Sequence, residues 1–187
     1  MLGAAFLAAL AGASSAYAHA HVGPPVSVIG TQLYSLAVPT EKEGLTTTRI
    51  VLTVPSGFSI DSFVPAAGWH REVQSTGSGE DTVIQKVTWT GGHTPTEEDS
   101  FFQFLGGGSS AKTYTFQVQQ TYSDGSIVDW NGPESSDTPA PTIEVKKTLG
   151  GSSDSTLTVI ALVLGALGVV IGGIALFARS GGGRQLA

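Results

Sequence analysis

Short segments that alternate between apolar and polar residues follow one another through the middle of the chain, and this pattern constrains the fold most. The clearest segment is Thr46–Val54, in which Thr48, Ile50, Leu52 and Val54 share one face. Successive side chains of a strand point to opposite sides of a sheet, so this alternation is typical of a strand with one buried face. No segment before residue 157 shows a helical period. The region is therefore expected to be all-β.

Turn-forming clusters separate the alternating segments. Gly, Ser, Pro and Asp recur between them, as in PSG, SGSGED and SDGS, and these residues favour tight turns. Several short strands without helices predict a β-sandwich. The Gly run at 106–108 is interpreted as a flexible hairpin loop, and 131–141 as an irregular loop because it contains three prolines. The expected strands are 32–38, 46–54, 69–74, 82–90, 100–105, 114–122, 127–130 and 142–146, and in 114–122 one face carries Tyr114, Phe116, Val118, Gln120 and Tyr122.

A long uncharged segment lies near the C-terminus. Residues 157–178 (LTVIALVLGALGVVIGGIALFA) carry no charge and are numerous enough to cross a bilayer as one helix. Residues 148–156 form a Gly/Ser-rich linker before this predicted transmembrane helix. Arg179 and Arg184 follow it in residues 179–187, which the positive-inside rule assigns to the cytoplasm.

The N-terminus is expected to be a secretory signal peptide. Residues 1–18 are apolar and rich in small residues, and two small-x-small cleavage sites follow each other (AYA and AHA). Cleavage after Ala18 would leave His19 first, whereas cleavage after Ala20 would leave His21 first. With the C-terminal span, this predicts a single-pass cell-membrane protein whose domain, residues 19–147, faces outside.

Composition excludes several classes of site. The chain of 187 residues has no Cys and one Met, the first residue. A disulfide framework, a thiolate metal site, a Cys nucleophile and a Met-rich Cu(I) site are therefore all excluded. The net charge of −6 argues against a nucleic-acid partner, which would require clusters of Lys and Arg. Nitrogen and oxygen donors remain as metal ligands.

Two of the 4 histidines lie at the predicted cleavage sites. A histidine at the mature N-terminus offers its α-amine and its imidazole, which together can chelate one Cu(II) ion. Cleavage after Ala18 also allows a second mode, in which the amine, backbone nitrogens and the imidazole of His21 bind Cu(II). Spacing alone leaves open whether these histidines bind copper or lie beside the cleavage site by chance. His70 and His93 are expected to be ordinary surface residues.

Catalytic motifs give little support for an enzyme. The chain lacks G-x-S-x-G, a P-loop and H-E-x-x-H, and the acidic run Glu97–Asp99 is expected to be a solvated loop. Two alternatives to a copper-binding protein stay open. One is a copper-dependent oxidase or monooxygenase, which would need a second histidine beside the first. The other is a metal-free adhesion or structural sandwich.

A series of short motifs in a fixed order resembles the YcnI-like family of bacterial secreted copper-binding domains. The resemblance covers about residues 19–147 and implies an immunoglobulin- or cupredoxin-like β-sandwich. The motifs are His21-Val22, V-P-x-E at 38–41, T-T-x-x-x-L-x-V-P at 47–55, P-x-x-G-W at 65–69, Y-x-D-G-S-x-V-x-W at 122–130 and D-T-P at 137–139.

The resemblance also implies a metal site. In that family Cu(II) is held by one N-terminal His with a nearby Glu and Trp, which correspond here to His21, Glu41 and Trp130. The additional His19-Ala20 before His21 makes His19 an alternative first residue. Trp69 and Trp89 are assigned to the core, and Asp124 with Gly125 to the turn that positions Trp130.

The sequence therefore predicts a membrane-anchored, extracytoplasmic Cu(II)-binding protein rather than an enzyme. Its expected role is copper acquisition, delivery or homeostasis. The expected partner is a copper transporter or copper chaperone of the cell envelope.

Overall fold

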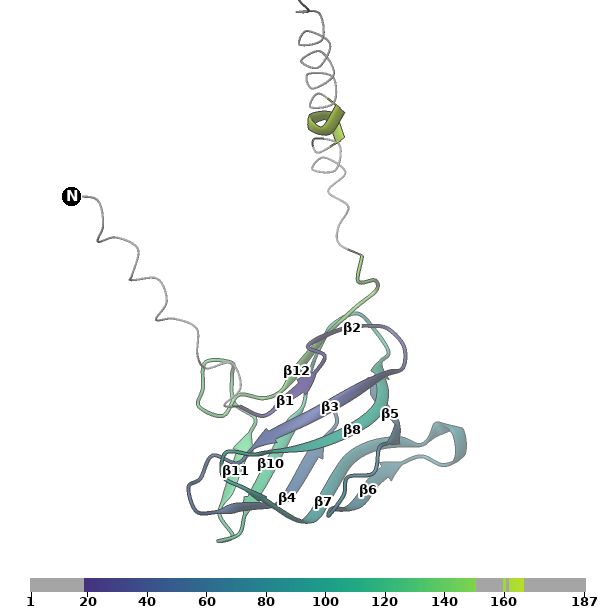
Figure 1. Cartoon of the computed structure of the whole chain (residues 1–187). Coiled ribbons are helices and arrows are strands. Elements are labelled where there is room, and N and C mark those ends of the chain that lie inside the picture. Colours follow the sequence, from purple (N-terminus) through teal and green to yellow (C-terminus); the bar gives the residue numbers. More distant parts are fainter. Residues whose placement is uncertain (1–18, 151–159, 161, 167–187) are drawn as a thin grey trace, which may run out of the picture. The chain divides into compact units, whose positions relative to one another are not determined.

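A computed structural model describes residues 19–150, 160 and 162–166 and shows an all-β domain of two facing sheets (Figure 1). One sheet has the order β1-β3-β8-β5 and the other β11-β10-β4-β7-β6, while β2, β12 and β9 form a third, smaller sheet. The strands are β1 (His21–Gly23), β2 (Val26–Val28), β3 (Gln32–Pro39), β4 (Thr46–Thr53), β5 (Phe58–Phe63), β6 (His70–Thr76), β7 (Val83–Pro95), β8 (Asp99–Gly108), β9 (Thr113–Thr115), β10 (Gln117–Tyr122), β11 (Ile127–Trp130) and β12 (Thr142–Lys146), with a 3₁₀ turn η1 (Gly79–Asp81) before β7.

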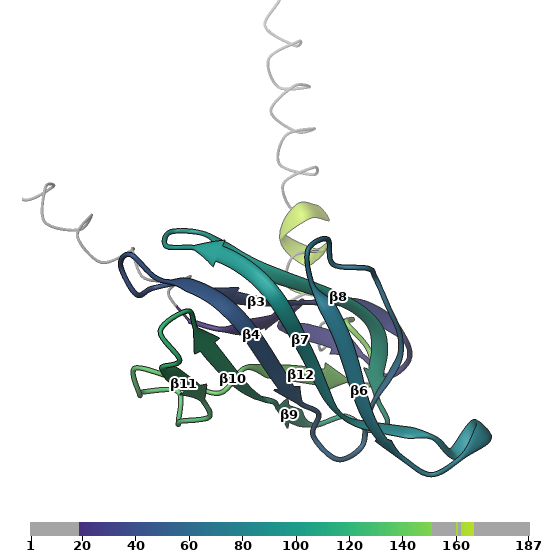
Figure 2. The same cartoon turned by 90° about the horizontal axis from the view of Figure 1, so that it is seen from below.

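The core lies between the two large sheets and is built by the alternation seen in the sequence. Ile50 and Leu52 of β4 are fully buried, as the pattern predicts, and the second sheet is seen side by side as β10, β4, β7 and β6 in Figure 2. Burial of one such large apolar side chain contributes about 1.5–3 kcal/mol. The prediction of an all-β sandwich is confirmed. The buried apolar cluster includes Tyr34, Leu36, Val38, Ile50, Leu52, Val87, Trp89, Phe102, Phe104, Val118 and Trp130.

The inward face predicted for strand 114–122 is confirmed, but the structure divides this segment into two strands, β9 and β10. Tyr114, Phe116, Val118, Gln120 and Tyr122 are all buried. The strand is interrupted at Phe116, whose backbone N–H donates to the carbonyl of Pro141 (2.8 Å). This break allows β9 to pair with β12 while β10 pairs with β4 and β11.

The interpretation of the Gly run as a flexible hairpin loop was wrong. Gly106, Gly107 and Gly108 form the end of β8, and the loop begins only after them. A Cβ atom on Gly107 would lie 2.2 Å from the carbonyl oxygen of Gly30, and one on Gly108 would lie 2.4 Å from the ring of Tyr114. Glycine is needed here because the neighbouring backbone and ring approach closely.

The C-terminal segment belongs to a second compact unit that begins at Gly150. Residues 160 and 162–166 of it are helical. Among the residues that the structure describes, there is no helix both long and apolar enough to span a bilayer. The signal peptide, the tail at 179–187 and most of the linker and of the transmembrane segment predicted at 157–178 lie outside the described residues.

Candidate metal centre

Trp130 ends β11 and is fully buried. A tight turn brings β11 back along β10, because Gly125 has a φ of 81° and the Asp124 carboxylate accepts hydrogen bonds from the N–H (2.9 Å) and hydroxyl (2.6 Å) of Ser126. Those two bonds hold the pKa of Asp124 below its usual value. The hairpin register places Trp130 opposite Val118. Asp124 and Gly125 thus form the turn that the sequence predicts.

The indole of Trp130 is oriented by a buried glutamine. Its Nε1–H donates to Oε1 of Gln120, which lies on the same inward face of the hairpin (3.0 Å). The indole nitrogen is only a donor, and its hydrogen is committed to this bond. Trp130 can therefore border a metal site with its ring, but it does not offer a nitrogen ligand.

His19 lies against the ring of Trp130. The two ring centroids are 6.0 Å apart and the planes meet at 63°, an edge-to-face arrangement. Burial of the next residues positions it: Ala20 and Val22 point into the core, and β1 pairs with β3. The apolar side chains at these alternate positions thus anchor the segment that bears His19.

Glu41 is the third group at this place. It follows β3 directly and its pKa is raised by partial burial, while the nearby imidazole of His19 acts in the opposite direction. An electrostatic effect of this kind requires the two side chains to be close. His19 is thus the residue that links Glu41 and Trp130.

The segment after β3 is fastened to the hairpin that bears Trp130. The Glu41 backbone N–H donates to the hydroxyl of Tyr122 (3.4 Å). Lys42 donates to the Ser126 hydroxyl (2.7 Å), and its Nζ lies 4.8 Å from the centre of the Tyr122 ring. These contacts keep the Glu41 backbone beside the β10–β11 hairpin without engaging the carboxylate.

His21 points away from the core because it lies between two inward-facing residues, Ala20 and Val22. Its Nδ1 lies 3.1 Å from the carbonyl oxygen of His19. Its side chain borders a cavity of about 700 Å³ that is also lined by Gly132 and Pro133. Of the four residues predicted for the metal site, the structure brings His19, Glu41 and Trp130 together. His21 instead borders the cavity of about 700 Å³.

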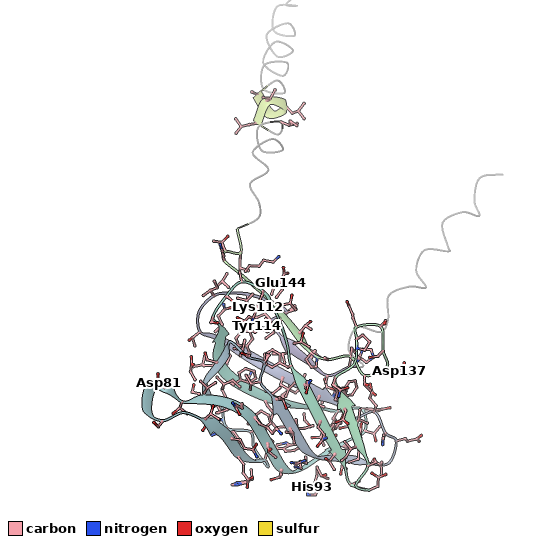
Figure 3. All side chains as sticks on the ribbon, turned by 180° about the vertical axis from the view of Figure 1, so that it is seen from behind. Asp81, His93, Lys112, Tyr114, Asp137 and Glu144 are labelled. Atoms are coloured by element: carbon pink, nitrogen blue, oxygen red, sulfur yellow. The ribbon has the colours of Figure 1, made fainter. Side chains whose placement is uncertain are left out.

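No group of three or more His, Asp or Glu side chains in the described part of the chain could hold a metal ion. A centre at His19 would therefore need a donor that is not a side chain, and the α-amine of a cleaved chain is one. The other two histidines lie on strands β6 and β7. His70 is on the edge strand β6, 3.9 Å from the Glu72 carboxylate. His93 is exposed on β7, next to Thr94, and is well separated from Asp137 in Figure 3.

An acidic cavity of about 470 Å³ adjoins Glu41. Its lining carboxylates come from the segment after β3 and from the β7–β8 turn, Glu97–Asp99, where a solvated loop is predicted. Glu97 has a φ of 69° in that turn.

Comparison with known proteins decides the family. The family described as a domain of unknown function, DUF1775, matches residues 19–145. The chain belongs to this YcnI-like family. Its domain is 34% identical over 128 residues to the copper-binding protein CutI of Bacillus subtilis. The aligned region covers 66% of this chain and 60% of that protein. The YcnI-like chain thus spans about 60% of the length of this curated relative.

A solved relative supports the fold. An uncharacterized protein from Nocardia farcinica, described as having an immunoglobulin-like fold, is 29% identical to the YcnI-like domain with a TM-score of 0.54. The match covers 68% of this chain and 97% of that one. The immunoglobulin-like β-sandwich that the resemblance implies is thereby confirmed.

Proposed function

We propose that the mature protein binds Cu(II) with His19 as its first residue, after cleavage following Ala18. One observation carries this choice of residue: the His19 ring lies edge to face against the ring of Trp130, with centroids 6.0 Å apart. The membership of the YcnI-like family and the 34% identity to a protein named as copper-binding support the choice of metal.

The donor set suits Cu(II). Cleavage frees the α-amine of His19, which with a ring nitrogen forms a chelate of two neutral nitrogen donors. The carboxylate of Glu41 adds an oxygen donor and one negative charge. The α-amine has an unperturbed pKa of about 8, so Cu(II) must displace a proton near neutral pH. The edge of the centre formed by Trp130 is apolar and excludes water.

The second binding mode uses the sequence His19-Ala20-His21. In it the amine, backbone nitrogens and the His21 imidazole bind Cu(II), and neither Glu41 nor Trp130 takes part. Loss of the His21 imidazole should weaken Cu(II) binding in this second mode but not in the first, so His21→Ala separates the two modes.

The wider role follows from the ends of the chain. A signal peptide, an outward domain and a span at 157–178 would tether the Cu(II) site to the cell membrane, facing outside. Such a protein would capture copper and pass it to an envelope copper transporter or chaperone, serving acquisition, delivery or homeostasis. The role expected here is binding rather than catalysis.

The test combines mass spectrometry of the protein purified from its native membrane with Cu(II) titration of the domain starting at His19. The expected terminus is His19. His19→Ala should lower Cu(II) affinity by at least about tenfold, the scale of a lost ligand contact, and His21→Ala should leave it nearly unchanged.

Three outcomes would count against the proposal. A terminus beyond His21, or undiminished binding by the double variant His19→Ala/His21→Ala, would exclude an N-terminal copper site. Loss of affinity in His21→Ala with little change in His19→Ala would show that His21 supplies the imidazole. His70→Ala is a matched control because His70 lies on β6, at the opposite edge of that sheet from β11.

A further inference from the structure

We infer that Gln120 is the positioning residue of the proposed copper centre: it holds the Trp130 ring and the segment that carries Glu41 at a fixed separation. The inference rests on the proposed function, because it concerns the same site. Gln120 itself touches neither His19 nor copper in this account. It acts through the two elements that border the metal.

The side-chain amide of Gln120 joins three parts of the chain. It is fully buried, on the inward face of β10. Its Oε1 accepts the indole hydrogen of Trp130 (3.0 Å). Its Nε2 donates to the carbonyl oxygen of Pro39 (2.8 Å) and to the hydroxyl of Thr47 (2.7 Å). Pro39 is the last residue of β3 and lies two residues before Glu41.

The orientation of this amide is fixed by its partners. An indole N–H can only donate and a backbone carbonyl can only accept, so the oxygen must face Trp130 and the nitrogen must face Pro39. Rotating the amide by half a turn would set donor against donor and acceptor against acceptor. Gln120 thus has one arrangement that satisfies both sides, and that arrangement sets where the indole lies relative to the end of β3.

The hydrogen bonds of Gln120 extend through Thr47 to Thr40, the residue before Glu41. Thr40 donates its hydroxyl hydrogen to the carbonyl of Thr94 (3.3 Å). The Thr47 hydroxyl, which accepts from Gln120, is 2.7 Å from the Thr40 hydroxyl, and the two share a hydrogen bond. Thr40, the residue immediately before Glu41, is consequently held from two sides. The chain of hydrogen bonds runs from Trp130 through Gln120 and Thr47 to Thr40.

The neighbouring inward residues of β10, Val118 and Tyr122, are buried, and an apolar side chain of similar volume would fit the space of Gln120. Such a side chain would leave the buried indole N–H of Trp130 without its acceptor and would break the link to Pro39. Burying an amide is favourable only when its hydrogen bonds are made. In the described residues every buried polar side-chain atom has a partner. What the amide adds is a link between the two elements that carry Trp130 and Glu41.

The experiment replaces Gln120 by a residue of similar length without hydrogen-bonding groups, Gln120→Met. The matched control is Gln119→Met on the same strand, because Gln119 is directed outward and bonds only to the exposed Asp129 carboxylate (3.0 Å). Three measurements are made on each full-length mature protein: the indole N–H resonance of Trp130 without metal, the Cu(II) dissociation constant, and the Cu(II) electron paramagnetic resonance spectrum.

Gln120→Met is expected to shift the Trp130 indole resonance and speed its hydrogen exchange. It should also weaken Cu(II) binding by about 10–100-fold, the usual effect of losing a residue that orients a metal-site group, and change the Cu(II) spectrum. Gln119→Met should match the wild type in all three. Thr47→Val removes the two bonds of the Thr47 hydroxyl, to Gln120 and to Thr40, and keeps the Trp130–Gln120 contact. It should cause a smaller change in the same direction and remains informative if Gln120→Met does not fold.

The inference is overturned if folded Gln120→Met, or Thr47→Val where that variant alone folds, keeps the wild-type affinity and Cu(II) spectrum. That result would leave the proposed function intact, provided His19→Ala still lowers the Cu(II) affinity. If the wild-type domain itself binds no Cu(II), the proposed function fails, and the indole resonance still reports whether Gln120 fixes Trp130.

Discussion

Trp89 and Trp130 are both buried, but they lie in regions of the domain with different surroundings. Trp89 lies in an aromatic cluster: its ring stacks on Phe102 with centroids 4.3 Å apart, and Phe63 meets it edge to face at 6.3 Å. Trp130 is also buried in the core, but its indole N–H donates to the amide of Gln120 and its ring meets the imidazole of His19 edge to face. The Trp89 region is described by ring packing, whereas the Trp130 region adds hydrogen bonds whose direction is fixed.

The difference separates stability from binding. An aromatic cluster tolerates small shifts of its rings, since packing and the hydrophobic effect have little directionality. A hydrogen-bonded network loses its arrangement when one donor or acceptor is removed. Substitutions in the Trp89 region should therefore alter the free energy of unfolding, whereas those around Trp130 should alter copper binding as well.

The largest effect on stability is expected for Trp89→Ala. Removing a buried indole from the stack leaves a cavity, so the free energy of unfolding should fall by about 3–5 kcal/mol. Denaturant unfolding measures this. The Cu(II) affinity of the fraction that remains folded should equal that of the wild type. A large loss of affinity in folded Trp89→Ala would show that the two regions are not separate.

Trp130→Phe is expected to have a smaller effect on stability and a larger one on copper. The phenyl ring keeps an aromatic surface beside His19, but Oε1 of Gln120 loses its donor, which costs about 1–3 kcal/mol. The Cu(II) spectrum should change, because the ring is no longer oriented from within the core. A wild-type spectrum together with unchanged stability would contradict the role given to the Trp130–Gln120 bond.

Glu41→Gln should affect copper with little change in stability. The raised pKa means that the folded state keeps this proton to higher pH than the unfolded chain does. The free energy of unfolding of the wild type therefore falls as the pH rises from the unfolded-state pKa of Glu41 through its folded-state pKa. Below both pKa values this cost is absent. The variant should thus gain in free energy of unfolding relative to the metal-free wild type over that interval.

Denaturant unfolding of both proteins from acidic to neutral pH tests that trend. The Cu(II) affinity of Glu41→Gln should be lower than that of the wild type at neutral pH. An unchanged affinity and Cu(II) spectrum would show that Glu41 is not a ligand.

Alternation predicts strands best where one face is buried against the core. β4 and the inward face of β9 and β10 follow directly from the spacing of apolar residues. Three strands, β1, β2 and β5, were missed. β1 and β2 each have 3 residues and prolines lie between them, so neither shows a period. In β5 the alternation of buried residues ends after Ile60, where the pairing with β8 shifts register. The glycines 106–108 were misread because close approach of Gly30 and Tyr114 depends on tertiary structure.

The candidate site could be predicted in its residue types but not in its geometry. The resemblance named His21, Glu41 and Trp130, and the second cleavage site left His19 as an alternative first residue. Apolar Ala20 and Val22 at alternate positions were a usable signal that His21 faces outward. Gln120 carried only a weak signal, a single polar residue on an otherwise apolar face, and its partners Pro39 and Thr47 are distant in sequence.

Chemical blocking of the mature N-terminus tests the central claim most directly. The domain beginning at His19 is prepared with a free α-amine and with an acetylated one, and both are titrated with Cu(II) at neutral pH. Acetylation is expected to lower the affinity by at least about tenfold, since it removes one donor of the chelate while the fold and every side chain remain. Equal affinities would show that the α-amine of His19 does not bind copper, and the proposed centre would be wrong.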